Sequence, residues 1–230
     1  MDEKTEELRE IFIDATGSES VTEGQVESPG SLTGGDEGAV LDRVAELVEE
    51  GTVTNLARAG LFAALVGAFA YVAIPTPFSP APVTLQVLGV FLAGILLGPV
   101  WGGFSMVLYL AAGALGAPVF AGGTAGLGVL VGETAGYLWS YPIAAAVVGA
   151  IVHRGTELRP PKEASVGLLV GAMVVGVAVI YGVGTVVMAA VLGLTLLEAF
   201  LLGAAAFVPF EAAKIAAAVG IVHSDRLAAV

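Results

Sequence analysis

The sequence predicts an all-α membrane protein with six transmembrane helices. Hydrophobic residues make up 57% of the 230 residues and charged residues only 13%, against about 25% charged residues in a typical soluble domain. Mean hydropathy is +0.90. The apolar runs are long enough to cross a hydrocarbon core of ~30 Å. The chain contains no cysteine, so neither disulfides nor thiolate metal ligands are expected.

The charge is concentrated in an N-terminal extension, residues 1–53. This extension holds 15 acidic and 3 basic residues, whereas residues 54–230 hold 6 of each. Residues 1–35 are polar and are predicted to be largely disordered. An apolar stripe in residues 36–50 predicts a short amphipathic helix that ends at Gly51 and packs on its own chain or docks on a partner. The acidity disfavours binding to nucleic acid.

The second domain, residues 54–230, is expected to hold the six helices. The first of these runs from about Thr54 to Ile74. An uncharged loop at 75–84 follows, and its four prolines forbid helix. This loop could lie over a cavity as a lid or serve as a plain connector.

The next apolar run, residues 85–116, would make one helix of ~48 Å, which is too long for a single crossing. The Gly98-Pro99 pair offers a break, so two short helices are predicted, at 85–97 and 99–115. The fourth and fifth helices are predicted at 133–152 and 166–192.

The last apolar region holds a second break. Thr195 and Glu198 form a T-x-x-E capping box, which predicts the start of a short helix near the surface. Proline is favoured in the first turn of a helix, so the sixth helix is predicted to start at Pro209 and to run to about His223 or beyond.

Basic residues orient the chain. If there are six spans, the basic residues that flank them all fall on one side of the membrane: Arg58, Arg154, Arg159, Lys162 and Arg226. The loops on the other side carry no Lys or Arg. The positive-inside rule makes that side cytoplasmic. We therefore expect a multi-pass protein of the cell membrane with both termini in the cytoplasm.

The glycine-rich stretch 118–137 has six glycines and one carboxylate, Glu133, and makes a poor helix. Non-helical backbone at membrane depth survives only where protein buries it or where it lines a cavity. The sequence therefore predicts a binding cavity bordered by this stretch.

Small residues recur four apart on the first helix, among them Ala59, Ala63 and Gly67. Such spacing lets two helices approach closely in lipid, either within the chain or against another membrane subunit. On the last helix, Glu211 and Lys214 share one face. Charged residues within a membrane usually face a partner or a cavity, so these two are either a self-paired ion couple or the polar end of a ligand site.

Sequence motifs for catalysis are absent. The chain has no P-loop, no H-E-x-x-H and no G-x-S-x-G, and its two histidines at predicted helix ends suggest no metal site. The sequence therefore predicts neither an enzyme nor a cofactor.

Several blocks resemble the BioY family, the biotin-binding S components of energy-coupling-factor (ECF) transporters. They are PVTLQ-x-LGVFLAG-x-LLGP (82–99), LYL-x-x-GA-x-G-x-PVFAGG (108–123), G-x-T-x-GYL-x-x-YP (132–142) and P-x-E-x-x-K (209–214). The resemblance covers residues 57–215. Two positions depart from the family: Glu133 stands where proline is common, and Glu211 replaces aspartate.

The resemblance implies an S-component fold with glycine-rich extracellular loops that captures biotin from outside. It implies docking, through Ala59, Ala63 and Gly67, on a transmembrane coupling subunit that carries two ATP-binding-cassette ATPases. The expected ligand-binding residues are Gln86, Tyr109, Phe120, Gly122, Gly123, Thr134, Tyr137, Glu211 and Lys214. The three aromatic residues would pack on the biotin rings, and Glu211 would accept from the ureido N–H groups. Lys214 would balance the ligand carboxylate or Glu211.

Three other readings remain open on the sequence alone. An S component for a different vitamin would keep the architecture and change the pocket. A membrane enzyme would need a catalytic constellation that the sequence does not show, and a purely structural scaffold would bind no small ligand.

Overall fold

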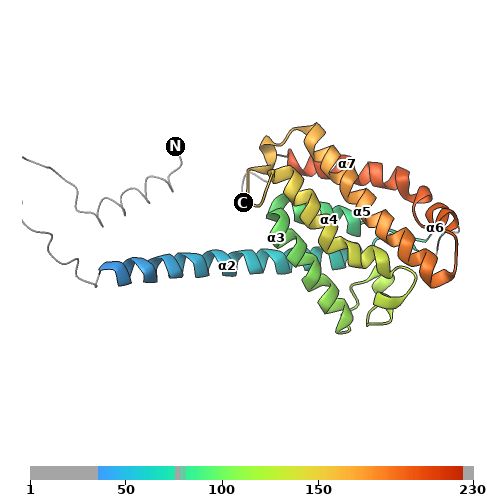
Figure 1. The fold of residues 1–230 in the computed structure, drawn as a ribbon, viewed down its shortest axis with the longest axis horizontal. Coiled ribbons are helices and arrows are strands. Elements are labelled where there is room, and N and C mark those ends of the chain that lie inside the picture. Colours follow the sequence, from blue (N-terminus) through green and yellow to red (C-terminus); the bar gives the residue numbers. More distant parts are fainter. Residues whose placement is uncertain (1–35, 76–78, 80, 225–230) are drawn as a thin grey trace, which may run out of the picture. The chain divides into compact units, whose positions relative to one another are not determined.

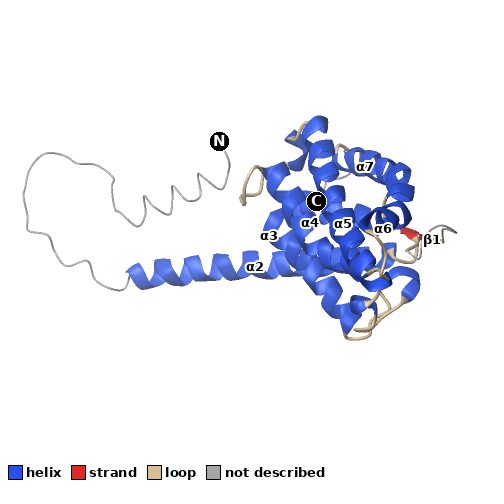
Figure 2. Ribbon diagram, turned by 45° about the vertical axis from the view of Figure 1, so that its right-hand side comes forward, coloured by secondary structure: helices blue, strands red, loops and turns tan. Residues whose placement is uncertain are grey.

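The computed structural model describes residues 36–75, 79 and 81–224, with side chains from Gly51 onward. The predicted disorder of residues 1–35 and the position of Arg226 lie outside this part. The chain divides into two compact units, residues 1–52 and 53–230. The second unit is here called the helical body. Figure 2 shows that it consists mainly of helices, with the short strand β1 in red.

Helix α2 (Asp36–Phe69) differs from the sequence prediction at both of its expected limits. It continues through Gly51, where the amphipathic helix was expected to end, because Gly lowers helix stability by only ~1 kcal/mol and does not forbid a helix. It ends at Phe69 rather than Ile74. Residues Ala73–Ile74 form strand β1, which pairs antiparallel with strand β2 (Val83–Thr84). Pro75 disfavours helix at the residue before it, so Ile74 is extended.

Helix α3 (Gln86–Ala114) is broken at the predicted position. Gly98 has φ 76° and ψ −177°, and Pro99 follows it. A Cβ placed on Gly102 would lie 2.9 Å from the Gly94 Cα, although eight residues of straight helix span ~12 Å. The two arms of α3 therefore fold back on one another at Gly98.

Helix α4 (Ala135–His153) packs between α3 and α5 (Val166–Leu192), and Figure 1 shows these helices side by side in the helical body. Helices α4 and α3 pack closely because glycines of both helices meet, Gly149 on α4 and Gly94 and Gly98 on α3. A Cβ on Gly149 would lie 2.6 Å from the Pro99 nitrogen. Large apolar side chains fill the rest of the core, including Phe91, Ile95, Met106, Leu169 and Met173.

The second predicted break is also present. Helix α6 (Leu196–Gly203) starts with the complete Thr195–Glu198 capping box, and a 3-10 turn (Ala205–Phe207) separates it from α7 (Val208–Val222). Pro209 lies in the first turn of α7, as predicted. This break places the start of α7, with Glu211 and Lys214, inside the bundle, where both side chains are buried.

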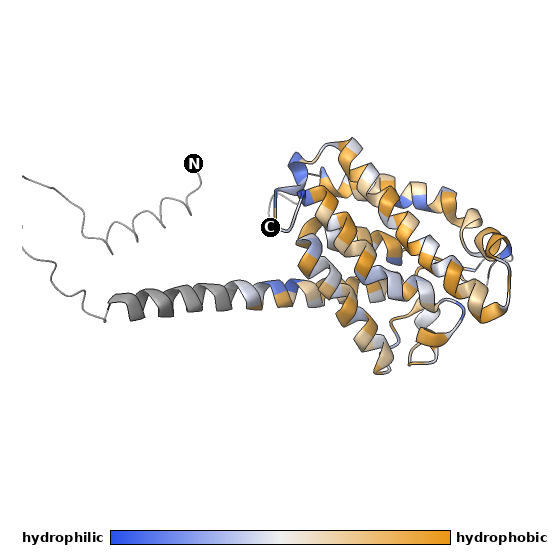
Figure 3. Ribbon diagram, viewed as in Figure 1, coloured by the Kyte–Doolittle hydropathy of each residue, from blue (hydrophilic) through white to orange (hydrophobic). Residues whose placement is uncertain are grey.

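Within the described residues, five helical segments are long and apolar enough to span a membrane. They are Gly51–Phe69, Gln86–Ala114, Ala135–His153, Val166–Leu192 and Leu196–Val222. Figure 3 shows apolar residues along these helices, with polar residues gathered mainly at the helix ends. The count is one below the predicted six because the two arms of α3 are counted as one helix.

Candidate functional site

A cavity of about 350 Å³ lies at the end of the body where α3, α4 and α7 begin. Its walls come from β2, the first turns of α3 and α4, the middle of α5, the break between α6 and α7, and the glycine-rich stretch. This volume falls in the range of small-molecule sites, ~300–1,000 Å³. The structure confirms that the glycine-rich stretch lines a cavity, through Phe120, Ala121, Thr124, Gly128, Val129, Gly132, Glu133 and Thr134.

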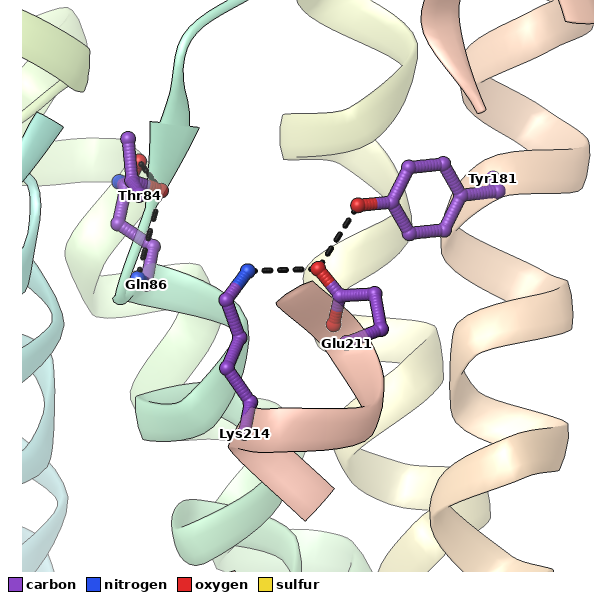
Figure 4. A network of polar contacts seen from close by, with 5 residues as sticks. All are labelled: Thr84, Gln86, Tyr181, Glu211 and Lys214. Atoms are coloured by element: carbon purple, nitrogen blue, oxygen red, sulfur yellow. Dashed lines mark hydrogen bonds and ion pairs between the residues drawn. The ribbon is translucent and has the colours of Figure 1, made fainter. Parts of the chain in front are cut away.

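Lys214 supplies a positive charge at the cavity wall, and Glu133 a negative one. Its Nζ donates to Glu211 Oε1 at 2.6 Å, and the Tyr181 hydroxyl donates to the same oxygen at 2.8 Å. Figure 4 shows Tyr181 approaching from α5, while the amine of Lys214 faces the side where Gln86 and Thr84 lie. The ion pair lowers the cost of holding each charge in a buried place. The ammonium keeps further donor capacity for a ligand.

Gln86 and Thr84 provide uncharged polar groups beside Lys214. The Thr84 hydroxyl donates to Gln86 Oε1 at 3.0 Å, and Gln86 Nε2 donates to the Tyr109 hydroxyl at 2.5 Å. Residues 86 and 109 would be ~34 Å apart in a straight helix. Their contact therefore depends on the fold-back at Gly98, which brings the two ends of α3 together.

Aromatic rings make up much of the remaining wall. Tyr137 and Tyr141, one turn apart on α4, line the cavity together with Phe120 and Phe207. The Tyr137 hydroxyl donates to the Gly203 carbonyl at 2.9 Å, which ties α4 to the end of α6. Tyr109 lies behind Phe120, edge to face at 5.5 Å between ring centres. Such a wall suits a flat or bicyclic apolar ligand.

The glycine-rich stretch is fastened to the end of α2. The Tyr71 hydroxyl donates to the Pro118 carbonyl at 2.7 Å, and the Gly122 N–H donates to the Ala70 carbonyl at 3.2 Å. Gly122 and Gly123 have φ of 67° and 77°, a backbone conformation that glycine adopts without strain. These contacts fix Phe120 and Thr124 at the cavity wall.

The structure brings most of the predicted ligand residues together. Gln86, Phe120, Thr134, Tyr137 and Lys214 line the cavity. Three others stand behind the wall: Tyr109 contacts Gln86 and Phe120, and Gly122 and Gly123 shape the turn after Phe120.

Glu211 does not border the cavity but lines a neighbouring groove. Toward the cavity it contacts the hydroxyl of Tyr181 and the amine of Lys214. Its role as a direct ligand contact stays a prediction.

Two tyrosines at the site were not predicted from the sequence. Tyr141 lies one turn after Tyr137 in the same block, so helical spacing could have indicated it. Tyr181 lies in the middle of α5, in a long apolar run with no flanking motif, and nothing in the sequence pairs it with Glu211.

The small residues of α2 divide between two faces. Ala59 and Gly67 are buried within the body: the Ser105 hydroxyl donates to the Ala59 carbonyl at 2.8 Å, and Val119 packs on Gly67. Ala63 is half-buried. These three residues therefore pack within the chain, which was one of the two alternatives. Gly60 and Ala64 on the other face are exposed, and docking on a partner stays a prediction.

At the opposite end of the body, ~27 Å away along α4, the His153 side chain replaces a backbone hydrogen bond that proline removes. Pro99 has no N–H to give to the Ile95 carbonyl, and His153 Nε2 donates to it at 2.9 Å instead. His153 Nδ1 accepts from the Arg159 N–H at 2.9 Å, so both ring nitrogens are used. In the described part of the chain, no three His, Asp or Glu side chains come close enough to hold a metal ion.

Comparison with known proteins agrees with the architecture and with the sequence blocks. The BioY family model matches residues 42–229. The chain belongs to the BioY family. A probable biotin transporter BioY from Pyrococcus horikoshii is 38% identical over 167 residues, which cover 73% of this chain and 91% of that protein. A biotin transporter BioY from Rhodobacter capsulatus is 45% identical over 131 residues, 56% of this chain and 66% of that protein.

A solved structure also has a fold similar to that of this chain. The crystal structure of the S-component for biotin from an ECF-type ABC transporter matches with a TM-score of 0.69 and 26% sequence identity. The match covers 79% of this chain and 94% of the other. Family membership and the apolar helices identify the chain as a multi-pass membrane transporter protein rather than an enzyme.

Proposed function

We propose that this chain is the biotin-binding S component of an ECF-type transporter. It captures biotin outside the cell and delivers it inward when docked to a transmembrane coupling subunit with two ATP-binding-cassette ATPases. The observation that carries this proposal is the cavity itself: one cationic side chain, Lys214, in a wall of aromatic rings, in a chain that belongs to the BioY family. Biotin joins a compact apolar bicycle to a ureido group and a carboxylate. The bicycle suits the aromatic rings of the wall, and the carboxylate suits Lys214.

Charge complementarity suggests how biotin lies in the cavity. Lys214 would pair with the biotin carboxylate, and Glu211 would act through Lys214 by holding its ammonium in place. The ureido N–H groups would reach acceptors at the other side, where Glu133 and Thr134 line the cavity. Phe120, Tyr137 and Tyr141 would cover the bicycle.

Six membrane crossings follow if each arm of α3 counts as one. The fold-back at Gly98 supports this count, because it places Gln86 and Tyr109 at the same end of the body. The cavity lies at that end, and the His153 end carries the loop with Arg154, Arg159 and Lys162. The positive-inside rule then puts the cavity outside and both termini in the cytoplasm.

Docking on the coupling subunit would use the exposed face of α2. Gly60 and Ala64 are four residues apart and have no side chain of the body over them. A partner helix could approach closely there. The ATPases would supply the energy for release, since the chain has no P-loop.

Mass spectrometry of small molecules retained through purification in detergent tests the ligand directly. Biotin should be released on denaturation in an amount close to one per chain. A different vitamin in that amount would identify an S component of other specificity, and no retained or stabilising ligand at all would contradict the proposal.

Biotin methyl ester tests the proposed orientation. The ester keeps the bicycle and removes the charge that would meet Lys214, so its affinity should fall by ~10-fold or more relative to biotin. Equal affinities would place the carboxylate away from Lys214 while leaving biotin as the ligand.

A further inference from the structure

A second hollow lies on the side of the body where α5 meets α6 and the start of α7. This groove has a volume of about 650 Å³ and is lined almost entirely by apolar side chains. Its rim is open: the exposed fractions of Val186, Leu197, Phe200 and Val208 are 57%, 67%, 47% and 60%. In a multi-pass membrane protein, an apolar rim of this kind faces lipid.

Two polar atoms interrupt the apolar lining. Thr185 Oγ1 and Glu211 Oε2 are buried and have no hydrogen-bond partner among the described residues. The other carboxylate oxygen of Glu211 is already used by Lys214 and Tyr181. A buried polar group without a partner costs about 1–3 kcal/mol, and more when it is charged. The floor of the groove, defined here by Thr185 and Glu211, therefore favours a ligand that brings a hydrogen-bond donor.

The depth of the floor suits the polar part of a lipid. The 27 residues of α5 span ~40 Å, close to the ~40–45 Å of a bilayer with its headgroups. Thr185 lies seven residues before Leu192, hence ~10 Å from that end of the helix. The floor is then within a few ångströms of the boundary between hydrocarbon and headgroups, where glycerol hydroxyls lie.

We propose that this groove binds a neutral membrane amphiphile with one hydrocarbon chain and a hydroxyl-bearing head. The chain lies along Val186, Leu197 and Phe200, and a head hydroxyl donates to Glu211 Oε2 beside the Thr185 hydroxyl. The head is neutral because Lys214 already compensates the charge of Glu211. Tyr181 lines both the groove and the cavity, so one side chain separates the amphiphile from the transport ligand.

Gly182 allows a test that leaves the cavity untouched. It lines the groove, and a Cβ there meets nothing within 4 Å, so the side chain of Gly182→Leu has room to enter the groove. Gly171→Leu is the matched control, because Gly171 is an exposed glycine of the same helix with equally open space and lies outside the groove.

The measurement is native mass spectrometry of the full chain in detergent, titrated with monooleoylglycerol. Wild type and Gly171→Leu should bind one molecule per chain, and Gly182→Leu should bind ~10-fold more weakly. Circular dichroism melting shows that both variants are folded. Equal binding by the two folded variants would overturn the site.

A second comparison tests recognition of the hydroxyl. Wild type should prefer monooleoylglycerol over methyl oleate, which has the same chain and no donor, and over the anion oleate. Thr185→Val should reduce the first preference by ~5-fold, the value of one net hydrogen bond. A wild-type chain that binds methyl oleate or oleate as well as monooleoylglycerol would overturn the proposed head chemistry.

Discussion

The chain breaks its apolar helices in two places, and the two breaks have opposite consequences. At Gly98–Pro99 the break is closed: His153 satisfies the carbonyl that proline leaves free, and glycines of α3 and α4 pack backbone against backbone. At Ala204–Phe207 the break stays open toward the cavity, with Gly203 and Phe207 in its wall and Lys214 about two helix turns beyond. In these two breaks, the neighbouring polar groups decide whether the interruption forms a structural hinge or part of the cavity wall.

The largest expected effect is at the open break. Lys214→Met leaves the Glu211 carboxylate buried and unpaired, so the free energy of unfolding should fall by ~3–5 kcal/mol. Chemical unfolding in detergent measures this change.

The double variant Glu211→Gln with Lys214→Met is the control for that result. It removes both charges, so it should recover most of the stability while still failing to bind biotin. A single variant as stable as wild type would show that the pair is not buried as described.

Substitutions at the closed break, Gly98–Pro99, should lower the stability of the protein and leave its affinity for biotin nearly unchanged. His153→Leu leaves the buried Ile95 carbonyl without a partner, at a cost of ~1–3 kcal/mol, and also removes the acceptor of the more exposed Arg159 N–H. The melting temperature should fall, and the biotin affinity of the folded fraction should stay within twofold to threefold of wild type.

His153→Gln, which can still donate and accept, should lose less stability than His153→Leu. A large loss of biotin affinity in either variant would mean that the two breaks are coupled and that the break at Gly98–Pro99 is not purely structural.

Tyr137→Phe probes the link between α4 and the open break. The change removes the hydrogen bond to the Gly203 carbonyl and should cost ~1 kcal/mol in stability and about fivefold in biotin affinity. Calorimetry and melting measure the two effects. Trp139→Phe offers a comparison, because its hydrogen bond to the Leu130 carbonyl lies outside the cavity wall and its loss should leave biotin affinity unchanged.

Thr195→Ala should have the smallest effect. It removes an exposed capping box at the start of α6, which is worth ~1 kcal/mol, whereas α6 meets the cavity at its other end, through Gly203. The melting temperature should drop slightly and biotin affinity should not change. A marked loss of affinity would show that the position of α6 controls the open break.

Much of this arrangement could be predicted from local sequence. Gly98-Pro99, the Thr195–Glu198 box and the glycine-rich stretch each act through backbone chemistry that a few residues determine. The end of the first helix was placed five residues too late, because pairing of Ile74 with Val83 involves a segment beyond the prolines. The positions of Tyr181 and of the two oxygens of Glu211 depend on how α5 packs on α7, which no local pattern encodes.

Isothermal titration with biotin, run on the purified wild-type chain and on the double variant Glu211→Gln, Lys214→Met, decides whether the cavity at Lys214 is the biotin site. We expect one biotin per wild-type chain with a Kd below ~1 μM, and binding weaker by at least ~100-fold in a folded double variant. Absence of wild-type binding up to ~1 mM biotin, or equal affinity in the two proteins, would contradict this expectation.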